Sequence, residues 1–367
     1  MGFCLILPYF ETAEAATRST TAKKSSTARV SQSSTKRVAS LKKSSGTRVR
    51  RYSTVRANNR RARLARAKAA AYARDMRVLA TPQYRTDANG MQVPDIRAEA
   101  AIIYNPVTHE VLWEENSNSS RSIASITKVM TAVVFLEHAS NLGYEIEVQP
   151  ADVRAASTTY LRAYERATPD TLLHLLLIGS DNAAARVLAR SSPFGSQGFI
   201  DRMNEKAKEL GLEATHYADP SGLDAANVSS AYDMARLIAF AGNDERIASI
   251  MRKGEQSVTT SRRTITVHST NKLVREGSDV REQVKGGKTG FIRQAGYCLA
   301  TLLQLPQGDP VAVVVLGARS NAGRFMETKH LLNWFSDRTK ALLTNDASKT
   351  AATGAAAAVS AVPQPQQ

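Results

Sequence analysis

The feature that most restricts the fold of this chain is the placement of its strand-forming segments. Two of them, 98–104 and 110–114, are joined through Asn105-Pro106 and predict a hairpin. Three more lie far along the chain, at 284–289, 296–304 and 311–318. Apolar residues at helical spacing dominate the sequence between the two groups, so distant strands must share one sheet around a helical insert. The sequence therefore predicts an α+β fold, with an antiparallel sheet flanked by helices and a helical subdomain.

The folded domain is expected to cover residues 96–343. Ordered structure should begin near Ile96, and an amphipathic helix over 325–343 should close the fold. Between the strands, helices are expected after Ser125 and over 171–178, 183–190, 199–210 and 230–241. The tail, 344–367, is rich in Ala, Pro, Gln and Thr and is expected to be disordered.

The formal charge of +16 belongs to one segment of the chain. Between Ala16 and Arg77 lie nineteen of the 49 Lys and Arg residues, with Asp75 as the one acidic residue, so the rest is nearly neutral. Large apolar side chains are scarce here, so residues 16–95 are expected to form a disordered basic arm and linker, with a transient helix around 60–74. The positive charge of the arm favours binding to a polyanion. If the chain is exported, we expect this partner to be an acidic envelope polymer or an anionic lipid and not a nucleic acid.

The N-terminus resembles a secretory signal peptide. An apolar run over 3–10 is followed by Ala13-Glu14-Ala15, similar to a cleavage site, although a basic n-region is missing. Residues 1–15 are therefore the candidate signal peptide, and the predicted location is the periplasm, with no transmembrane anchor evident. Removal of this segment would leave Cys298 as the single cysteine. The histidines lack metal-ligand spacing, and neither a metal nor a cofactor is predicted.

A serine and a lysine at helical spacing form the first candidate site. Ser125 and Lys128 lie three residues apart, which puts both side chains on one face of a helix and lets the lysine amine take the serine proton. An apolar stripe marks this helix as part of the core: Ile126, Val129, Met130, Val133 and Val134. Free backbone N–H groups at the start of the helix favour developing negative charge there.

Two further motifs complete a recognisable set. Ser180-Asp181-Asn182 lies in a break between predicted helices, and Lys288-Thr289-Gly290 ends a predicted strand entered through Gly286-Gly287. S-x-x-K, S-D-N and K-T-G in this order are the signature of penicillin-binding proteins and class A β-lactamases. Over about residues 95–340 the chain resembles the penicilloyl serine transferases, and within them the low-molecular-mass D-alanyl-D-alanine carboxypeptidases and endopeptidases. The likeness includes 219–223 and 271–274, and it implies a β-lactamase/transpeptidase-like catalytic domain.

The requirements of acyl transfer give the polar side chains their expected roles. Ser125 would be the nucleophile, and Lys128 the base, which must be deprotonated to act. The positive charge of Lys288 is expected to lower the pKa of Lys128. Ser180 can relay a proton to the leaving amine, with Lys288 holding it in place.

Other residues are expected to bind the substrate. Asn182 offers an amide to the substrate peptide and to the lysine base, while glycines such as Gly290 let a substrate backbone lie along the strand edge. By family resemblance, the backbone N–H groups of the nucleophile and of Phe291 form the oxyanion hole. Thr289 and Arg324 are expected to bind a substrate carboxylate. The implied partners are peptidoglycan peptides as substrates and β-lactam antibiotics as inhibitors.

Three alternatives remain open at the level of sequence. A class A β-lactamase needs a deacylating carboxylate, but around 216–224 the chain offers only Asp219 and Asp224, without an E-x-x-L-N pattern. A carboxypeptidase of this family usually carries a second β-rich domain and an amphipathic anchor, so the polar tail favours a D,D-endopeptidase. In the third alternative, the chain is a non-catalytic wall-binding protein that uses its basic arm, but the intact motifs argue against it.

Overall fold

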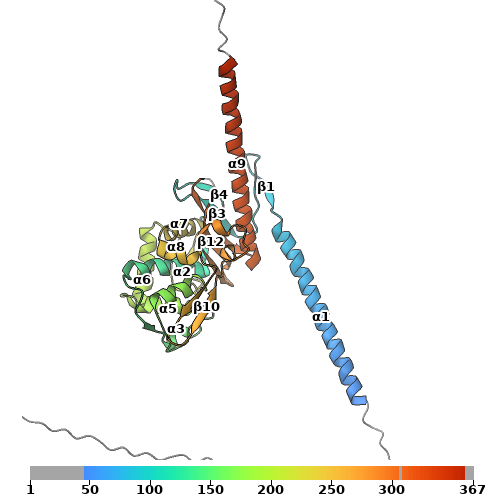
Figure 1. Cartoon of the computed structure of the whole chain (residues 1–367), viewed down its shortest axis with the longest axis vertical. Helices are drawn as coiled ribbons and strands as arrows, with labels where there is room; N and C mark the ends of the chain where they lie inside the picture. The colour runs from blue at the N-terminus through green and yellow to red at the C-terminus, as the bar shows by residue number, and fades with distance from the viewer. Residues whose placement is uncertain (1–44, 306–307, 360–367) are drawn as a thin grey trace, which may run out of the picture. The chain divides into compact units, whose positions relative to one another are not determined.

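The structure is a computed structural model that describes residues 45–305 and 308–359. Contacts within the chain divide it into two units, 1–66 and 67–367. The described part of the first unit is the beginning of helix α1 (Ser45–Ala80), and the elements that follow α1 all belong to the second unit. Figure 1 labels several of them.

A five-stranded antiparallel sheet forms the centre of the second unit, in the order β11-β12-β13-β3-β4. β3 (Ala100–Tyr104) and β4 (Val111–Glu115) form the predicted hairpin, and β11 (Val284–Ile292), β12 (Gly296–Gln304) and β13 (Pro310–Ala318) come from the far end of the sequence. The two groups join where β13 pairs with β3, with Val314 opposite Ile102. The expected α+β fold, built around a sheet of distant segments, is confirmed.

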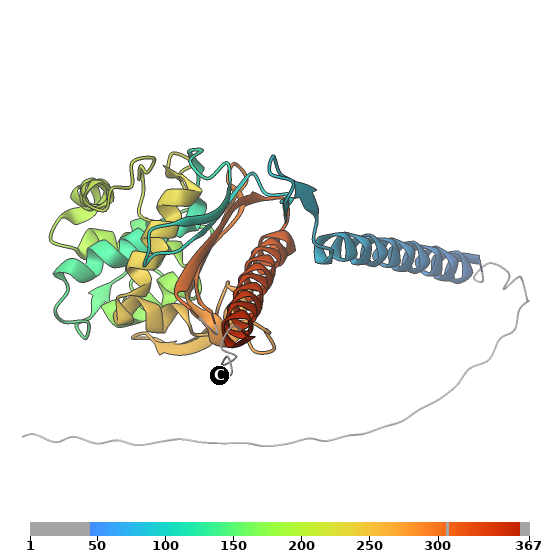
Figure 2. The same cartoon turned by 90° about the horizontal axis from the view of Figure 1, so that it is seen from above.

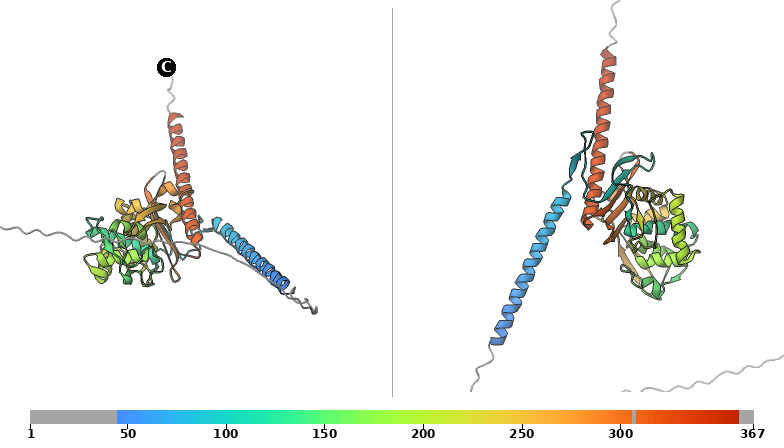
Figure 3. Two further views of the ribbon diagram at one scale, coloured as in Figure 1. Left: turned by 60° about the horizontal axis from the view of Figure 1, so that its bottom comes forward. Right: turned by 180° about the vertical axis from the view of Figure 1, so that it is seen from behind.

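Both faces of this sheet are covered, as Figures 2 and 3 show. Along β13, Ala312 and Val314 belong to the larger core on the side of the helical insert, whereas Val313 and Val315 pack on the side of α9 (Asn321–Val359). This alternation follows from the two-residue period of a strand. Burial of each valine contributes about 1.5–3 kcal/mol, so neither face of the strand can be left open to water.

The helical insert is built around α2 (Thr127–His138). Each of its residues from Thr127 to Leu136 is buried, and α4, α5, α6 and α7 all contact it. The other helices of the insert are α3 (Pro150–Val153), α4 (Pro169–Leu177), α5 (Asn182–Ser191), α6 (Gly195–Glu209), α7 (Ala231–Gly242) and α8 (Glu245–Met251). Side-chain oxygens cap four of them at the N-terminus: Thr168, Asp181, Ser230 and Asp244.

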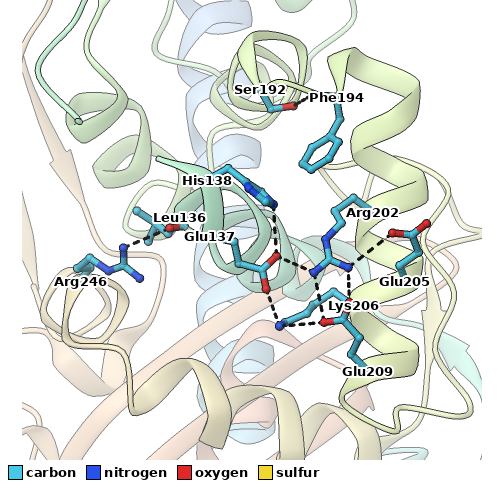
Figure 4. Close-up of polar contacts among 10 residues, drawn as sticks. All are labelled: Leu136, Glu137, His138, Ser192, Phe194, Arg202, Glu205, Lys206, Glu209 and Arg246. Carbon is cyan, nitrogen blue, oxygen red and sulfur yellow. Dashed lines mark hydrogen bonds and ion pairs between the residues drawn. The ribbon is translucent and has the colours of Figure 1, made fainter. Parts of the chain in front are cut away.

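An ion-pair network ties the C-terminal end of α2 to α6 (Figure 4). The Glu137 carboxylate forms ion pairs with the Arg202 Nη2, at 3.0 Å, and with the Lys206 Nζ, at 2.5 Å. Both cations also contact Glu209, and the adjacent His138 ring meets Phe194 edge-on, with 4.9 Å between ring centroids. The network fixes α2 at the end opposite Ser125.

Short elements complete the second unit. Four are pairs of short strands: β1 (Tyr84–Thr86) with β2 (Gln92–Pro94), β5 (Arg121–Ser122) with β8 (Val228–Ser229), β6 (Ile146–Glu147) with β7 (Arg166–Ala167), and β9 (Glu255–Thr259) with β10 (Thr264–His268). Three are 3-10 turns: η1 (Ala124–Ile126), η2 (Lys272–Val274) and η3 (Arg281–Gln283). Among the described helices, none combines the length and apolar character that a bilayer span requires.

Over 45–95 the structure differs from the expected disordered arm and extends the helix expected around 60–74. Helix α1 covers Ser45–Ala80, and the β1–β2 hairpin precedes the expected start at Ile96. The scarcity of apolar residues argues against burial, but Ala and Arg are strong helix formers in water, and most described side chains from residue 59 to 80 are exposed. The hairpin is anchored by buried Val93 and by Trp334 of α9, whose Nε1 donates to the Gln92 carbonyl.

The closing helix is longer than predicted. α9 runs from Asn321 to Val359 and includes residues 344–359, which were expected to be disordered. The alanines of this stretch explain the difference, because alanine has the highest intrinsic helix propensity. The candidate signal peptide, 1–15, the arm as far as residue 44 and the last residues, 360–367, lie outside the described residues.

Candidate active site

Ser125 lies in the short turn η1 that leads into α2, and Lys128 lies in the first turn of that helix. The Lys128 Nζ donates to the Ser125 Oγ at 2.9 Å, so the predicted pair is in contact. The turn packs closely on Gly222: a Cβ there would lie 2.0 Å from the Ala124 carbonyl oxygen. Gly222 also has a φ of +77°, and both constraints exclude a side chain at this position.

The amine of Lys128 is fully buried among acceptors. Besides Ser125, it donates to the Asn182 Oδ1 at 2.6 Å and to the Ser221 carbonyl. Burial lowers the pKa of Lys128 to about 7, against the opposing charges of Asp219 and Asp181. The expectation that the charge of Lys288 causes this shift was wrong about the main cause, which is desolvation.

Ser180 lies in the turn between α4 and α5 with a φ of +59°, a left-handed conformation that is rare for a residue with a side chain. The Lys288 Nζ, also fully buried, donates to the Ser180 Oγ at 2.8 Å. Burial lowers the pKa of Lys288 well below its usual value, and the charges of Lys128 and Arg324 add to the shift. Hydrogen bonds thus connect the three motifs: Lys288 of K-T-G contacts Ser180 of S-D-N, and Asn182 of S-D-N contacts Lys128 of S-x-x-K.

β11 brings the third motif to the site as an edge strand. One of its edges pairs with β12, and the strand approaches η1 closely: a Cβ on Gly290 would lie 2.6 Å from the Ile123 carbonyl oxygen. The Thr289 Oγ1 donates to the Thr270 Oγ1 at 2.7 Å. Phe291 has a side chain that is 52% exposed and stacks on Tyr297. The predicted strand end at residue 289 was too early, since β11 continues to Ile292.

Arg324 supports the back of this strand. Its side chain is buried, and its Nη1 donates to the carbonyls of Gly290, at 2.9 Å, and Cys298, at 3.0 Å. Its Nη2 donates to Asn321 Oδ1 at 2.6 Å. Both terminal nitrogens therefore have protein acceptors, and the expected contact with a substrate carboxylate stays a prediction.

Comparison with known proteins identifies the family. A family model described as D-alanyl-D-alanine carboxypeptidase matches residues 87–320. The chain belongs to this family. The resemblance inferred from the three motifs is thereby confirmed.

Its relatives within the D-alanyl-D-alanine carboxypeptidase family include endopeptidases. The chain is 32% identical over 241 residues to a D-alanyl-D-alanine endopeptidase of Haemophilus influenzae, covering 65% of this chain and 82% of that protein. A second one, from Escherichia coli, is 33% identical over 246 residues, with 66% and 78% covered. Among solved structures, the Streptomyces K15 DD-transpeptidase is similar with a TM-score of 0.62 and 28% identity, covering 67% of this chain and all of that one.

The contribution of the 219–223 loop to the candidate site was not expected from the sequence. Asp219 accepts hydrogen bonds from the backbone of Ser221, Gly222 and Asp224, and from the Asn227 side chain. Burial opposes the charge of this carboxylate, but these bonds outweigh it and lower the pKa of Asp219. The loop presents the Ser221 carbonyl to the lysine amine. The Asp-Pro-Ser-Gly sequence predicts a turn at this place, but it does not show that the turn contacts the Lys128 amine.

Within 45–305 and 308–359, no group of three or more His, Cys, Asp or Glu side chains is arranged to hold a metal ion. Cys298 is buried in the middle of β12, where the sequence placed it in the core.

Proposed function

We propose that this protein is a serine D,D-peptidase of peptidoglycan that cleaves D-alanyl cross-links through an acyl-enzyme at Ser125. The observation that carries the proposal is the buried Lys128 amine, 2.9 Å from the Ser125 Oγ and with a pKa of about 7. Near neutral pH a large share of this amine is unprotonated and can accept the serine proton.

Acylation then proceeds by successive proton transfers. Lys128 takes the proton of Ser125 while the Oγ attacks the D-alanyl carbonyl carbon, and the backbone N–H groups of Ser125 and Phe291 hold the developing oxyanion. When the tetrahedral intermediate collapses, the C–N bond breaks and the leaving amine needs a proton. The Ser180 hydroxyl, which accepts a hydrogen bond from Lys288, gives its proton to this amine and takes up the proton that Lys128 removed from Ser125, so that Ser180 and Lys128 both return to their starting states. Attack by water on the ester releases the peptide and restores Ser125.

The edge of β11 is the surface on which the substrate backbone lies. The edge opposite β12 pairs with no other described strand, and at Gly290 the strand approaches η1 too closely for any side chain. An extended peptide can add to this edge as a further strand, with backbone hydrogen bonds supplying affinity. Asn182 binds the peptide bond of the substrate, and Thr289 together with Arg324 binds its carboxylate.

The endopeptidase activity rests on the pattern of relatives. Endopeptidases of three bacteria are 31–33% identical to the chain, which covers 77–82% of their lengths. The carboxypeptidases DacF of Bacillus subtilis and DacD of Escherichia coli are 29–30% identical, with 61–64% of their lengths covered. Trimming of stem pentapeptides is therefore the second candidate.

Purified protein given equal amounts of a cross-linked muropeptide dimer and a monomeric pentapeptide distinguishes the two activities. We expect mass spectrometry to show loss of the dimer, and no loss with Ser125→Ala. Faster loss of terminal D-alanine from the pentapeptide would instead establish the carboxypeptidase. Loss of neither substrate, together with no adduct after penicillin, would contradict the proposed function.

β-Lactams act on this site as slowly released inhibitors. Asp219 is a candidate for the deacylating carboxylate of a β-lactamase, but its oxygens already accept the hydrogen bonds of its own loop. The penicilloyl ester on Ser125 should therefore persist for many minutes, which intact-mass analysis can follow.

The basic segment, 16–77, serves to localise the enzyme in the periplasm. Within the described part, α1 carries basic side chains such as Arg60, Arg63 and Arg74, all exposed, and little apolar surface. An exported helix of this kind suits an acidic envelope polymer or anionic lipid, and not a nucleic acid.

A further inference from the structure

The turn that carries Ser180 is held by a loop that the proposed chemistry does not otherwise involve. This loop, 156–165, lies between α3 and β7. The Asn182 Nδ2 donates to the Ala156 carbonyl at 2.6 Å, and the Asn182 backbone N–H donates to the Thr158 carbonyl at 2.9 Å. These two bonds fix the orientation of the amide, whose Oδ1 accepts the hydrogen bond from Lys128.

The same loop also holds the residues on either side of Ser180. Asp181 is fully buried, and its Oδ2 accepts from the Tyr160 backbone N–H at 2.5 Å and from the Thr159 hydroxyl at 3.1 Å. The Tyr160 ring packs on Gly179, where a Cβ would lie 2.8 Å from the Tyr160 Cε2. A left-handed residue such as Ser180 stays in place only when its neighbours are restrained in this way.

An ion pair between the buried Glu165 and the partly exposed Arg263 fastens the far end of the loop to the tip of the β9–β10 hairpin. Glu165 is fully buried, and its Oε1 accepts from the Thr260 hydroxyl at 2.6 Å and from the Arg263 Nε at 3.2 Å. The other oxygen accepts from the Arg162 backbone N–H at 2.9 Å. The Arg263 Nη2 donates to the Tyr160 carbonyl, so one guanidinium joins the carboxylate to the residue that holds Asp181.

We propose that Glu165 and Arg263 are positioning residues for the Ser180–Asn182 turn. Neither touches Ser125 or Lys128; they act through Tyr160, which transmits the position of the hairpin tip to Asp181 and so to the first residue of α5. The inference rests on the proposed function, because it assigns these residues to the alignment of its proton-transfer groups. It goes beyond that function because it names a support from an element far along the chain.

Glu165→Gln tests the proposal directly. The amide has one accepting oxygen, so it cannot serve Thr260 and Arg263 on one side and the Arg162 N–H on the other. A misplacement of about 1 Å far from the chemistry can cost about 100-fold in rate, so we expect acylation by penicillin to slow by roughly 10- to 100-fold. The variant is measured with its melting temperature, which reports whether it is folded.

The pH profile separates positioning from a loss of folded protein. The Asn182 Oδ1 accepts from the Lys128 ammonium and thereby favours its charged form. Loosening this contact lowers the pKa of Lys128. In Glu165→Gln the acid side of the plot of acylation rate against pH should therefore move to lower pH. A smaller folded fraction would reduce the rate equally at all pH values.

The chain provides matched controls for this experiment. Glu145 pairs with Arg166 at 3.0 Å beside the same loop, but both side chains are about half exposed, so Glu145→Gln should leave rate and profile unchanged. Thr260→Val removes one donor to Glu165 and should slow acylation to a smaller extent; it is the variant to use if Glu165→Gln does not fold. Arg263→Gln combined with Glu165→Gln should cost little more than Arg263→Gln alone, because the pair acts as a unit.

The positioning role would be overturned if folded Glu165→Gln or Thr260→Val were acylated at the wild-type rate and with the wild-type pH profile. Fully additive effects of Glu165→Gln and Arg263→Gln would overturn it too. Failure of the proposed function gives a different result: the wild-type protein itself would form no Ser125 adduct.

Discussion

Acidification is the perturbation that tests the role of Lys128 most directly. Burial lowers the pKa of this amine from its usual 10.5 to about 7. The shift corresponds to about 5 kcal/mol at 1.36 kcal/mol per pKa unit, and it favours the neutral form that can accept a proton. With such a pKa about 90% of the amine is neutral at pH 8 and about 1% at pH 5, so acylation should slow about 90-fold between these values.

The assay is the rate of penicilloyl adduct formation, followed by quenched-flow intact-mass analysis from pH 5 to 9. The rate should rise tenfold per pH unit on the acid side and level off above neutrality. Lys128→Arg provides the control, since a guanidinium stays protonated across this range and should leave acylation slow at every pH. A flat profile, or a rate that still rises tenfold per pH unit between pH 8 and 9, would refute the view that a desolvated Lys128 is the base.

Three further results follow from the same site. Ser125→Ala should abolish the single penicillin adduct, and a surviving adduct seen by intact mass would displace the nucleophile to another residue. Lys288→Ala should slow acylation far more than Lys272→Ala, by about 2–4 kcal/mol of transition-state stabilisation; equal effects in the kinetic assay would mean that the site is misplaced. Deletion of residues 16–77 should leave turnover of a small cross-linked muropeptide nearly unchanged while sacculus binding, steeply salt-dependent in the full chain, is lost. Salt-insensitive sacculus binding would contradict the last of these.

The sheet and the three motifs were predictable because they depend on local patterns. Apolar runs bounded by turn residues marked β3, β12 and β13, and S-x-x-K was meaningful because an apolar stripe followed it. Of helix α1, only a transient helix around 60–74 was predicted, and its full length was missed for a physical reason: composition indicates whether a segment can bury itself, whereas backbone propensity can form an exposed helix.

The supports of the site could not be predicted, because they join residues that are distant in sequence. Glu165 meets Arg263 only through the fold, and the Ser221 carbonyl contacts Lys128 as a backbone atom whose residue type carries no signal. The cause of the Lys128 shift was misjudged for the same reason. A sequence shows which charges are present, but desolvation depends on how the helices close over the amine.

The surroundings of Lys288 lead to one last prediction. Burial lowers the pKa of Lys288 well below its usual value, and the positive charges of Arg324 and of Lys128, when Lys128 is protonated, add to this shift. A ligand carboxylate bound at Thr289 would bring the opposite charge, raise the pKa of Lys288 and cause it to take up a proton from solution. Calorimetry of Ser125→Ala with a D-alanyl-D-alanine peptide, in two buffers of different ionisation enthalpy at pH 8, measures this uptake. The same peptide with a C-terminal amide is the matched control and should take up none; equal uptake for both, or uptake for neither, would mean that the carboxylate binds away from Lys288.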